Sequence, residues 1–362
     1  MTNLTPARAA SGVSRRLVRT LNASLKQASA SMRTRQDFLQ RKAEFQRLET
    51  LFGPLDGVMK SRIKTYAREV LGAEKHWREL ASYTLIAGEF REGWIPDTYM
   101  RKHVLPKTAG ALRQFSKLKS MTRRLLPDAP LPDIGYFAND VFLNRDFRVL
   151  STGQLERTLF KECDKIIFKG DASFGAKSIL VLDRAGFDPD AVRNYKSGVF
   201  QRFVSQHADL AAVSPGPVVS LRVITWCGED GKVVPCGSTL RMGRKTQGYV
   251  GEGERFVSSV DIATGCLRGP AYDGDWRKFE AHPDTGVVFD GHQLPKFFDA
   301  VEVARHLHGM FPYVRLIGWD LVIEEDESVA VLEWNFFPGV EVTEALAGPC
   351  FLGLGWEDYW RG

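Results

Sequence analysis

Three polar residues near the end of the chain have the types and spacing of a metal site. Asp320 lies in the apolar run 317–323, and Glu333 and Asn335 lie in the apolar run 329–335. The acidic loop between these runs predicts a β-hairpin. A symmetric register about that loop places Asp320 opposite Glu333, with Asn335 on the same face. Opposed carboxylates destabilise a sheet unless a cation lies between them, and such oxygens are the ligands that Mg²⁺ prefers.

The opposite face of this hairpin is expected to belong to the core. The symmetric register also pairs Leu321 with Leu332 and Val322 with Val331. The apolar face then carries Trp319, Leu321, Ile323, Ala330, Leu332 and Trp334. The polar face is predicted to bind Mg²⁺, with Mn²⁺ as the alternative ion. The alternative interpretation needs no metal: Asp320 and Glu333 would simply be two exposed acids at a strand edge.

A second stretch that could do chemistry is the loop 170–177, which lies between two apolar runs. Its small residues, among them Ser173 and Gly175, would let backbone N–H groups approach a phosphate closely. The spacing nearly matches a P-loop, but Lys177 comes one position too late and a strand follows where a P-loop requires a helix. This argues against a P-loop protein. Lys169 ends the preceding strand and faces the loop, a sensible place for a cation that contacts a nucleotide.

These residues must be positioned by helices and strands, and the sequence patterns predict an α+β fold with largely antiparallel strands. Spacings of three and four predict two amphipathic helices in the N-terminal part, through Val18, Leu21, Leu25, Ala28 and Met32 and through Phe38, Phe45, Leu48 and Phe52. Helical patterns continue over 60–125, with breaks at Ile95-Pro96 and Leu105-Pro106. From about residue 126 the chain turns β-rich, with strands predicted at 165–168, 179–182, 218–226, 319–323 and 329–335. A helix is predicted over 296–310.

Taken in order, segments over about residues 95–345 resemble the ATP-grasp superfamily, and specifically its sugar-transfer-associated family. The resemblance is carried by PheLysGlyAspAlaSerPheGlyAlaLysSerIle (168–179), ValPheGlnArgPheValSerGlnHisAlaAspLeu (199–210), SerLeuArgValIleThrTrp (220–226), LeuArgMetGly (240–243), GlyTrpAspLeu (318–321) and LeuGluTrpAsnPhePheProGly (332–339). No single motif is specific. Their shared order and spacing make the resemblance strong.

The resemblance implies an ATP-grasp fold that holds ATP between two antiparallel-rich α+β subdomains. It assigns Lys169 to the phosphates together with Lys119, the nearest match to the family's first ATP lysine. Further ATP contacts are implied for Ser173, Gly175, Lys177, Gln201, Phe203, Val204 and His207. Arg222 and Arg241 would be catalytic, offsetting charge that develops on the phosphoryl group, and Asp320, Glu333 and Asn335 would bind the metal.

Several of these positions also have a structural interpretation. Arg222 lies in an apolar strand where an unpaired charge is costly, so a phosphate partner is favoured over an ion pair. Arg241 could equally be a surface arginine, Gln201 could only satisfy backbone groups, and His207 could be a packed histidine. The loop has fewer glycines than is usual in the family. The first 60 or so residues lie outside the resemblance.

Composition indicates an ordinary globular protein. Hydrophobic residues make up 44% and charged residues 26% of the 362 residues. No apolar stretch approaches the roughly 20 residues that span a bilayer, and the N-terminus lacks the apolar run of a secretory signal. The five cysteines form no CxxC pair and suit neither a disulfide framework nor a zinc site. The cytoplasm is the expected compartment.

The charge is unevenly distributed along the chain. Residues 1–125 hold 25 of the 49 lysines and arginines but only 10 of the 44 aspartates and glutamates. This basic part could meet an anionic glycan carrier or the inner face of a membrane, or its helices could form a homodimer. A solvated basic surface is the simpler alternative. No zinc-finger or RNA-binding signature accompanies the charge, so nucleic acid is not expected.

Four segments are expected: a basic helical extension (1–60), an N-terminal part of the core (61–160), a nucleotide-loop subdomain (161–210) and a metal- and substrate-binding subdomain (211–362). The resemblance implies a Mg-ATP-dependent ligase that activates a carboxylate as an acyl phosphate and joins it to an amine. Family context suggests that a sugar acid or amino sugar of bacterial polysaccharide supplies one of these groups. A kinase of the same fold and a nucleotide-binding scaffold without turnover stay open as alternatives.

Overall fold

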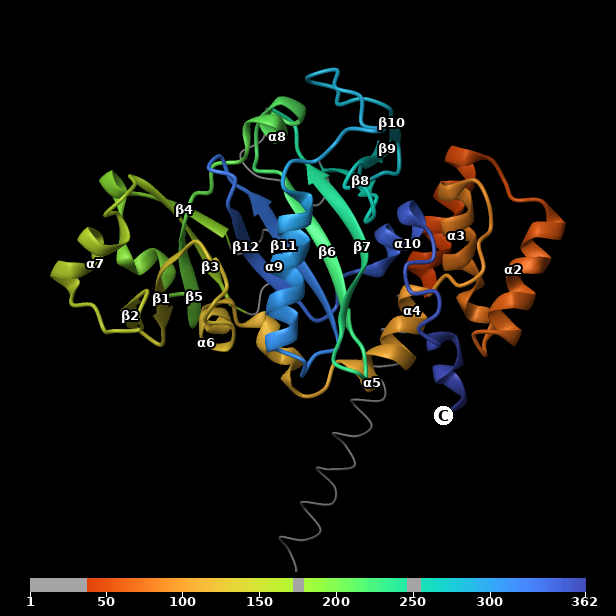
Figure 1. Cartoon of the computed structure of the whole chain (residues 1–362), viewed down its shortest axis with the longest axis horizontal. Helices are drawn as coiled ribbons and strands as arrows, with labels where there is room; N and C mark the ends of the chain where they lie inside the picture. Colours follow the sequence, from red (N-terminus) through yellow and green to blue (C-terminus); the bar gives the residue numbers. More distant parts are fainter. Residues whose placement is uncertain (1–37, 172–178, 246–254) are drawn as a thin grey trace, which may run out of the picture.

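The strands form two antiparallel sheets in the computed structural model, which describes residues 38–171, 179–245 and 255–362 (Figure 1). The smaller sheet has the order β2 (Val141–Asn144), β1 (Asp133–Ala138), β5 (Ser197–Arg202), β3 (Lys165–Gly170) and β4 (Ile179–Asp183). The helix α7 (Thr152–Leu159) contributes Leu155 and Leu159 to its core. Because β1 and β2 precede residue 160, the expected division between residues 160 and 161 runs through this sheet.

The larger sheet has seven strands and carries helices on both faces. Its order is β10 (Lys278–Phe279), β9 (Leu267–Tyr272), β8 (Phe256–Val260), β7 (Val233–Met242), β6 (Ser220–Cys227), β11 (Leu316–Ile323) and β12 (Val329–Asn335). The helix α9 (Phe297–Met310) covers one face and shares a core with Leu221, Val223 and Trp319 (Figure 1). The α+β fold, the antiparallel strands and the helix predicted over 296–310 are thereby confirmed.

The other face of the larger sheet packs on a group of helices that we call the helical body. It comprises the helix over 38–52, α2 (Gly57–Glu69), η1 (Glu74–His76), α3 (Trp77–Ala87), α4 (Asp97–Tyr99), η2 (Met100–Val104), α5 (Leu105–Thr108), α10 (Val340–Ala347) and η8 (Trp356–Arg361). Ile224, Trp226 and Leu316 of the sheet join its core. The helix predicted through Val18–Met32 lies outside the described residues.

The proline at position 106 does not end the helical run, contrary to the prediction. The chain continues from α4 through η2, a π-helical turn, into α5. Pro106 lies in the first turn of α5, directly after the π-helical turn, and the helical run continues through it.

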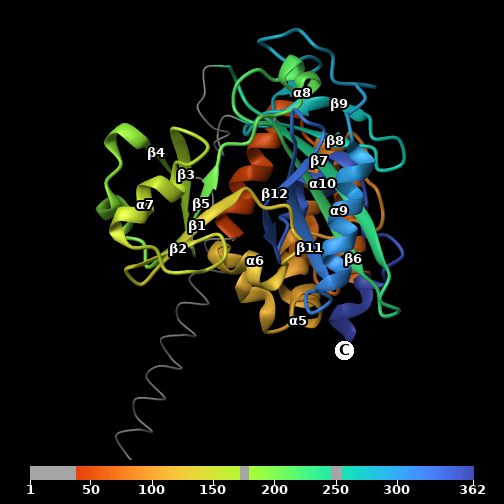
Figure 2. The same cartoon turned by 60° about the vertical axis from the view of Figure 1, so that its left-hand side comes forward.

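Short turns connect the helical body to the two sheets. They are η3 (Leu112–Lys117), η4 (Lys119–Met121) and α6 (Thr122–Leu125). η3 contacts β12 of the larger sheet and η4 contacts β5 of the smaller one. Figure 2 shows α6 at the junction between the sheets. The remaining short helices are η6 (Arg184–Gly186), η7 (Pro189–Val192) and α8 (Ala208–Val213).

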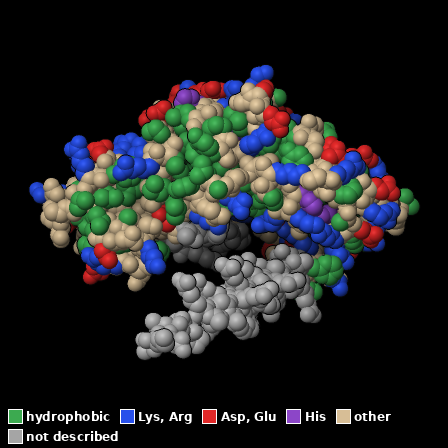
Figure 3. Space-filling model, turned by 90° about the horizontal axis from the view of Figure 1, so that it is seen from below, with side chains coloured by type: hydrophobic (Ala, Val, Ile, Leu, Met, Phe, Trp, Pro, Cys, Tyr) green, Lys and Arg blue, Asp and Glu red, His purple; other side chains and the backbone are tan. Residues whose placement is uncertain are grey.

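Part of the basic excess of residues 1–125 lies on the lower face of the helical body. Figure 3 shows lysine and arginine side chains gathered beside a histidine there. Lys75, Lys102 and Lys107 are exposed. Burial and the neighbouring Lys102 lower the pKa of Lys75, and the same two causes lower the pKa of His103. Within the described ranges, no helix is long and apolar enough to span a membrane.

Candidate functional site

The strands β11 and β12 form the predicted hairpin. Asp320 lies opposite Glu333, and Trp319 lies opposite Trp334 on the reverse face. Both tryptophans are fully buried in the core under α9. Asp320 therefore faces away from α9, toward the side of the sheet that the helical body partly covers.

Beyond the Asp320–Glu333 pair the register differs from the prediction. Leu321 pairs with Val331, and Val322 pairs with Ala330. The shift is a β-bulge: Leu332 lies between Val331 and Glu333 but has no partner between Leu321 and Asp320 on the other strand. The predicted partners of Leu321 and Val322 were therefore wrong, and Val329 and Val331 occupy the core face where Ala330 and Leu332 were expected.

Asp320 is the centre of a buried ionic group. The neighbouring strand β6 places Arg222 opposite it. Arg222 donates through Nε and Nη2 to the two carboxylate oxygens of Asp320, at 2.5 and 2.7 Å, and through Nη1 to the Pro338 carbonyl at 2.6 Å. Arg241 Nη1 lies 3.3 Å from the same carboxylate. The prediction favoured a phosphate partner for Arg222. The structure gives it an ion pair, which satisfies a buried guanidinium without any ligand.

The two arginines control the charge of this group. Burial would raise the pKa of Asp320, but Arg222 and Arg241 outweigh it and hold that pKa at about 2. Burial lowers the pKa of Arg241 to about 10, and the repulsion of Arg222 acts in the same direction. At neutral pH Asp320 is therefore an anion flanked by two cations.

Lys119 meets the hairpin at Glu333, and Lys169, from a separate part of the chain, lies near enough for its charge to interact with Glu333. Asn335 Nδ2 donates to Glu333 Oε1 at 3.1 Å and lies 3.4 Å from Asp320 Oδ2. Lys119 Nζ, from η4, lies 3.8 Å from Glu333 Oε2. Burial lowers the pKa of Lys169 on β3; Glu333 raises it, and Lys119 lowers it further. The structure therefore brings both predicted lysines to the predicted carboxylates, at the junction of the two sheets.

We call residues 201–207, the predicted ATP contacts at the end of β5, the hinge; their side chains have mostly structural contacts. Gln201 is buried, and its Nε2 donates to the buried Asp133 carboxylate at 2.9 Å. His207 caps α8 by accepting the Asp209 N–H on Nδ1 at 3.2 Å. Phe203 is 41% exposed and Val204 is half-buried.

A bidentate ion pair that the sequence did not reveal ties this hinge to the hairpin. Arg202 donates from Nη1 and Nη2 to the two oxygens of Glu324, each at 2.6 Å. The His207 N–H donates to the Ile323 carbonyl at 2.9 Å, so the backbone of the hinge also runs beside the hairpin. The end of β5 is thereby fixed to the hairpin turn. The two partners are 122 positions apart, and no local pattern connects them.

Residues 189–353, a little under half of the chain, match the family model described as sugar-transfer associated ATP-grasp. This segment identifies an ATP-grasp region within the chain. The matched segment contains Arg222, Arg241 and the whole hairpin, whereas Lys119 and Lys169 lie before it.

Solved structures of ATP-grasp proteins are similar at low identity. They include biotin carboxylase from Campylobacter jejuni (11% identity, TM-score 0.39, covering 66% of this chain and 45% of that one) and D-alanyl-alanine synthetase A from Vibrio cholerae (11%, 0.38, 68% and 63%). A third is the ATP-grasp ligase PsnB (14%, 0.39, 68% and 61%). The chain spans less than two thirds of the length of each. No curated protein matches it significantly.

The hairpin offers a donor set that suits a hard divalent cation. Two carboxylates converge, and the Asn335 amide contacts both through Nδ2. Rotation of this amide would aim its oxygen at the same place, giving three oxygen ligands of the kind Mg²⁺ takes. In the part of the chain that the structure describes, no group of three or more His, Cys, Asp and Glu side chains forms a metal site. The hairpin site therefore depends on Asn335 and on further oxygens from phosphates or water.

The start of the predicted nucleotide loop is tied to the turn that carries Lys119. Asp171 accepts hydrogen bonds from the Ser120 N–H at 3.0 Å and from Ser120 Oγ at 2.5 Å. Ser120 follows Lys119, and Asp171 lies two residues after Lys169, so this contact sets the two lysines relative to each other. The sequence did not single out either residue, since they are 51 positions apart. The predicted loop residues Ser173, Gly175 and Lys177 lie outside the described residues.

Proposed function

We propose that this protein is an ATP-grasp ligase that uses Mg-ATP to activate a carboxylate as an acyl phosphate and joins it to an amine. One observation carries the proposal. Lys119, Lys169, Glu333, Asn335 and Asp320, from three separate regions of the chain, converge at the junction of two sheets. Two buried or half-buried lysines beside two carboxylates form a site that suits a polyphosphate together with a divalent cation.

Each residue has a distinct part in the proposed reaction. Lys119 and Lys169 would neutralise phosphate charge, while Asp320, Glu333 and Asn335 would hold Mg²⁺, or Mn²⁺ in its place. The metal supplies charge neutralisation and alignment of the phosphates. Arg241, the less tightly paired of the two arginines, would stabilise the charge that develops as the substrate carboxylate attacks the γ-phosphoryl group. We assign Arg222 to holding Asp320 in place.

The family description supports a sugar acid or amino sugar of bacterial polysaccharide as one substrate. We further propose a cytoplasmic location. The basic residues 1–60 would meet an anionic glycan carrier or membrane surface, or pair two copies of the chain. The hinge and loop residues, Gln201, Phe203, Val204, His207, Ser173, Gly175 and Lys177, remain proposed contacts of ATP.

Product analysis tests the reaction class. Purified protein is incubated with Mg-ATP, a panel of uronic acids and a panel of amines, and the products are identified by mass spectrometry. We expect ADP, inorganic phosphate and an amide in equal amounts. A phosphorylated acceptor without free phosphate would identify a kinase. Binding of Mg-ATP without turnover on any pair would favour a nucleotide-binding scaffold.

A further inference from the structure

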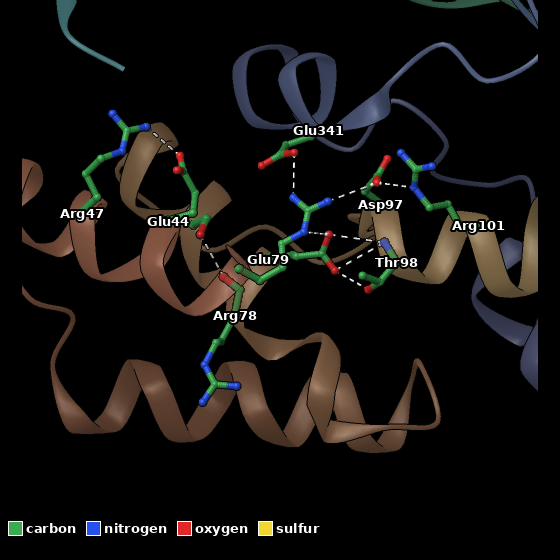
Figure 4. Close-up of polar contacts among 10 residues, drawn as sticks. Glu44, Arg47, Arg78, Glu79, Asp97, Thr98, Arg101 and Glu341 are labelled. Carbon is green, nitrogen blue, oxygen red and sulfur yellow. Dashed lines mark hydrogen bonds and ion pairs between the residues drawn. The ribbon is translucent and has the colours of Figure 1, made fainter. Parts of the chain in front are cut away.

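A buried ionic cluster joins the helix over 38–52 to α10 (Figure 4). Arg41 lies on that helix and contacts three carboxylates: Glu79 of α3 at 3.4 Å, Asp97 of α4 at 3.2 Å and Glu341 of α10 at 2.8 Å. Arg101 adds a second cation, 2.7 Å from Asp97. The side chains of Glu79 and Asp97 are only 4% exposed. Four separate elements of the helical body therefore meet at one guanidinium.

The cluster holds more negative than positive groups, so Arg41 keeps mutually repelling carboxylates together. Burial raises the pKa of Glu79 to about 7, against the opposing effect of Arg41. Without Arg41, the Glu79, Asp97 and Glu341 carboxylates would face one another in a poorly solvated place. Of the three, Glu341 is the most exposed, at 29%, and lies in the first turn of α10. It is therefore the group that is free to move away.

The turn that precedes α10 is part of the candidate active site. This turn, residues 336–339, follows Asn335 directly, and its Pro338 carbonyl accepts the hydrogen bond from Arg222. It also packs closely on β11, since a Cβ added to Gly318 would come within 2.6 Å of Pro338. The Arg101 guanidinium lies over the Phe337 ring at 4.0 Å. The turn is thus held by Arg222 on the sheet side and by the ionic cluster on the other.

We propose that Arg41 is a positioning residue of the active centre. By holding Glu341, Arg41 fixes the turn 336–339 against β11. The Pro338 carbonyl of this turn then stays in place to accept the hydrogen bond from Arg222, which holds Asp320. The helix over 38–52 lies outside residues 189–353, the segment that matches the family model. The effect of Arg41 on nucleotide binding rests on the proposed function, whereas its effect on the turn does not.

Arg47 is a matched control on the same helix. It pairs with Glu44 at 2.8 Å and with Asp275 at 3.1 Å, and contacts neither Glu341 nor the turn. Hydrogen exchange of the backbone amides of residues 336–342 is measured in the full-length protein without nucleotide. We expect Arg41→Gln to speed this exchange about tenfold, the size of coupling seen within one ion-pair network, and Arg47→Gln to leave it unchanged. Equal exchange in both variants would overturn the proposal.

A second substitution separates positioning from general loosening. In the Arg41→Gln background, Glu341→Gln removes the carboxylate that the other two repel, so exchange in 336–342 should return toward the wild-type rate. The affinity for Mg-ATP should fall about tenfold in Arg41→Gln and recover in the double variant.

No recovery of exchange in the double variant would overturn the positioning role. If Arg41→Gln does not fold, the single variant Glu341→Gln is used instead. It should speed hydrogen exchange in 336–342 and leave exchange in 38–52 unchanged. Faster exchange in both regions would overturn the positioning role of Arg41. Failure of the wild-type protein to bind Mg-ATP would reject the proposed function, and the exchange data would still decide the role of Arg41.

Discussion

Replacing Glu333 by glutamine should reduce Mg-dependent ATP binding and turnover by at least about 100-fold while the protein stays folded. Substitutions in the outer shell of metal sites already cost about 10- to 100-fold, and Glu333 is a proposed direct ligand. Glutamine has a similar volume, so packing against Lys119 and Asn335 should change little. Titration calorimetry with Mg-ATP, together with circular dichroism, measures the two effects separately.

Glu325 provides the control for this experiment. It lies in the turn of the same hairpin and is exposed, so Glu325→Gln makes the same chemical change away from the site. We expect wild-type Mg-ATP binding in that variant. Near-normal metal-dependent binding in Glu333→Gln would reject the hairpin as the metal site.

Replacing Asp320 by asparagine should lower the free energy of unfolding by about 3–5 kcal/mol, the usual effect of breaking a buried ion pair from one side. Asp320 and Arg222 are only 6% and 5% exposed, so the arginine would stay buried and charged without its counter-ion. Urea unfolding followed by tryptophan fluorescence measures the loss, since Trp319 and Trp334 lie on the reverse of the same strands.

A double replacement tests whether the unpaired charge is the cause. Asp320→Leu combined with Arg222→Met removes this ion pair and leaves only Arg241 without its partner. Apolar replacements of buried ion pairs are often close to neutral. We expect the double variant to be more stable than Asp320→Asn. An equal or larger loss in the double variant would contradict this explanation. The pKa of Asp320, held at about 2, also predicts that this stabilisation is present at neutral pH and lost as the pH falls from about 4 toward 2.

The hairpin could be predicted because its information is local. Two apolar strands flank one acidic turn, and a register symmetric about its centre opposes Asp320 and Glu333. The pairing next to the turn is offset by one residue from that register, and the bulge at Leu332 restores the Asp320–Glu333 pair. The bulge at Leu332 could not be predicted, because it depends on which residues best fill the core under α9 and not on the turn. The prediction therefore held at Asp320 and was wrong by one position between Asp320 and the turn.

Contacts between distant segments account for most of what the sequence did not show. The partner of Arg222 lies 98 positions away, and finding it requires that β6 and β11 are neighbours in the sheet. The motif order of the family indicated that Arg222 belongs to the site, yet not that a carboxylate already satisfies it. The Arg41 cluster was invisible for the same reason, since Glu341 lies 300 positions from Arg41.

Transfer of oxygen-18 from a labelled substrate carboxylate to inorganic phosphate tests the proposed acyl phosphate most directly. In that route one carboxylate oxygen becomes bonded to phosphorus, and attack of the amine on the carbonyl releases it with the phosphate. Hydroxylamine can replace the amine, so only the carboxylate has to be found, beginning with uronic acids. We expect one labelled oxygen in phosphate for each ADP and each hydroxamate formed. Turnover that releases unlabelled phosphate, or that leaves phosphate bonded to an acceptor hydroxyl, would contradict the ligase mechanism.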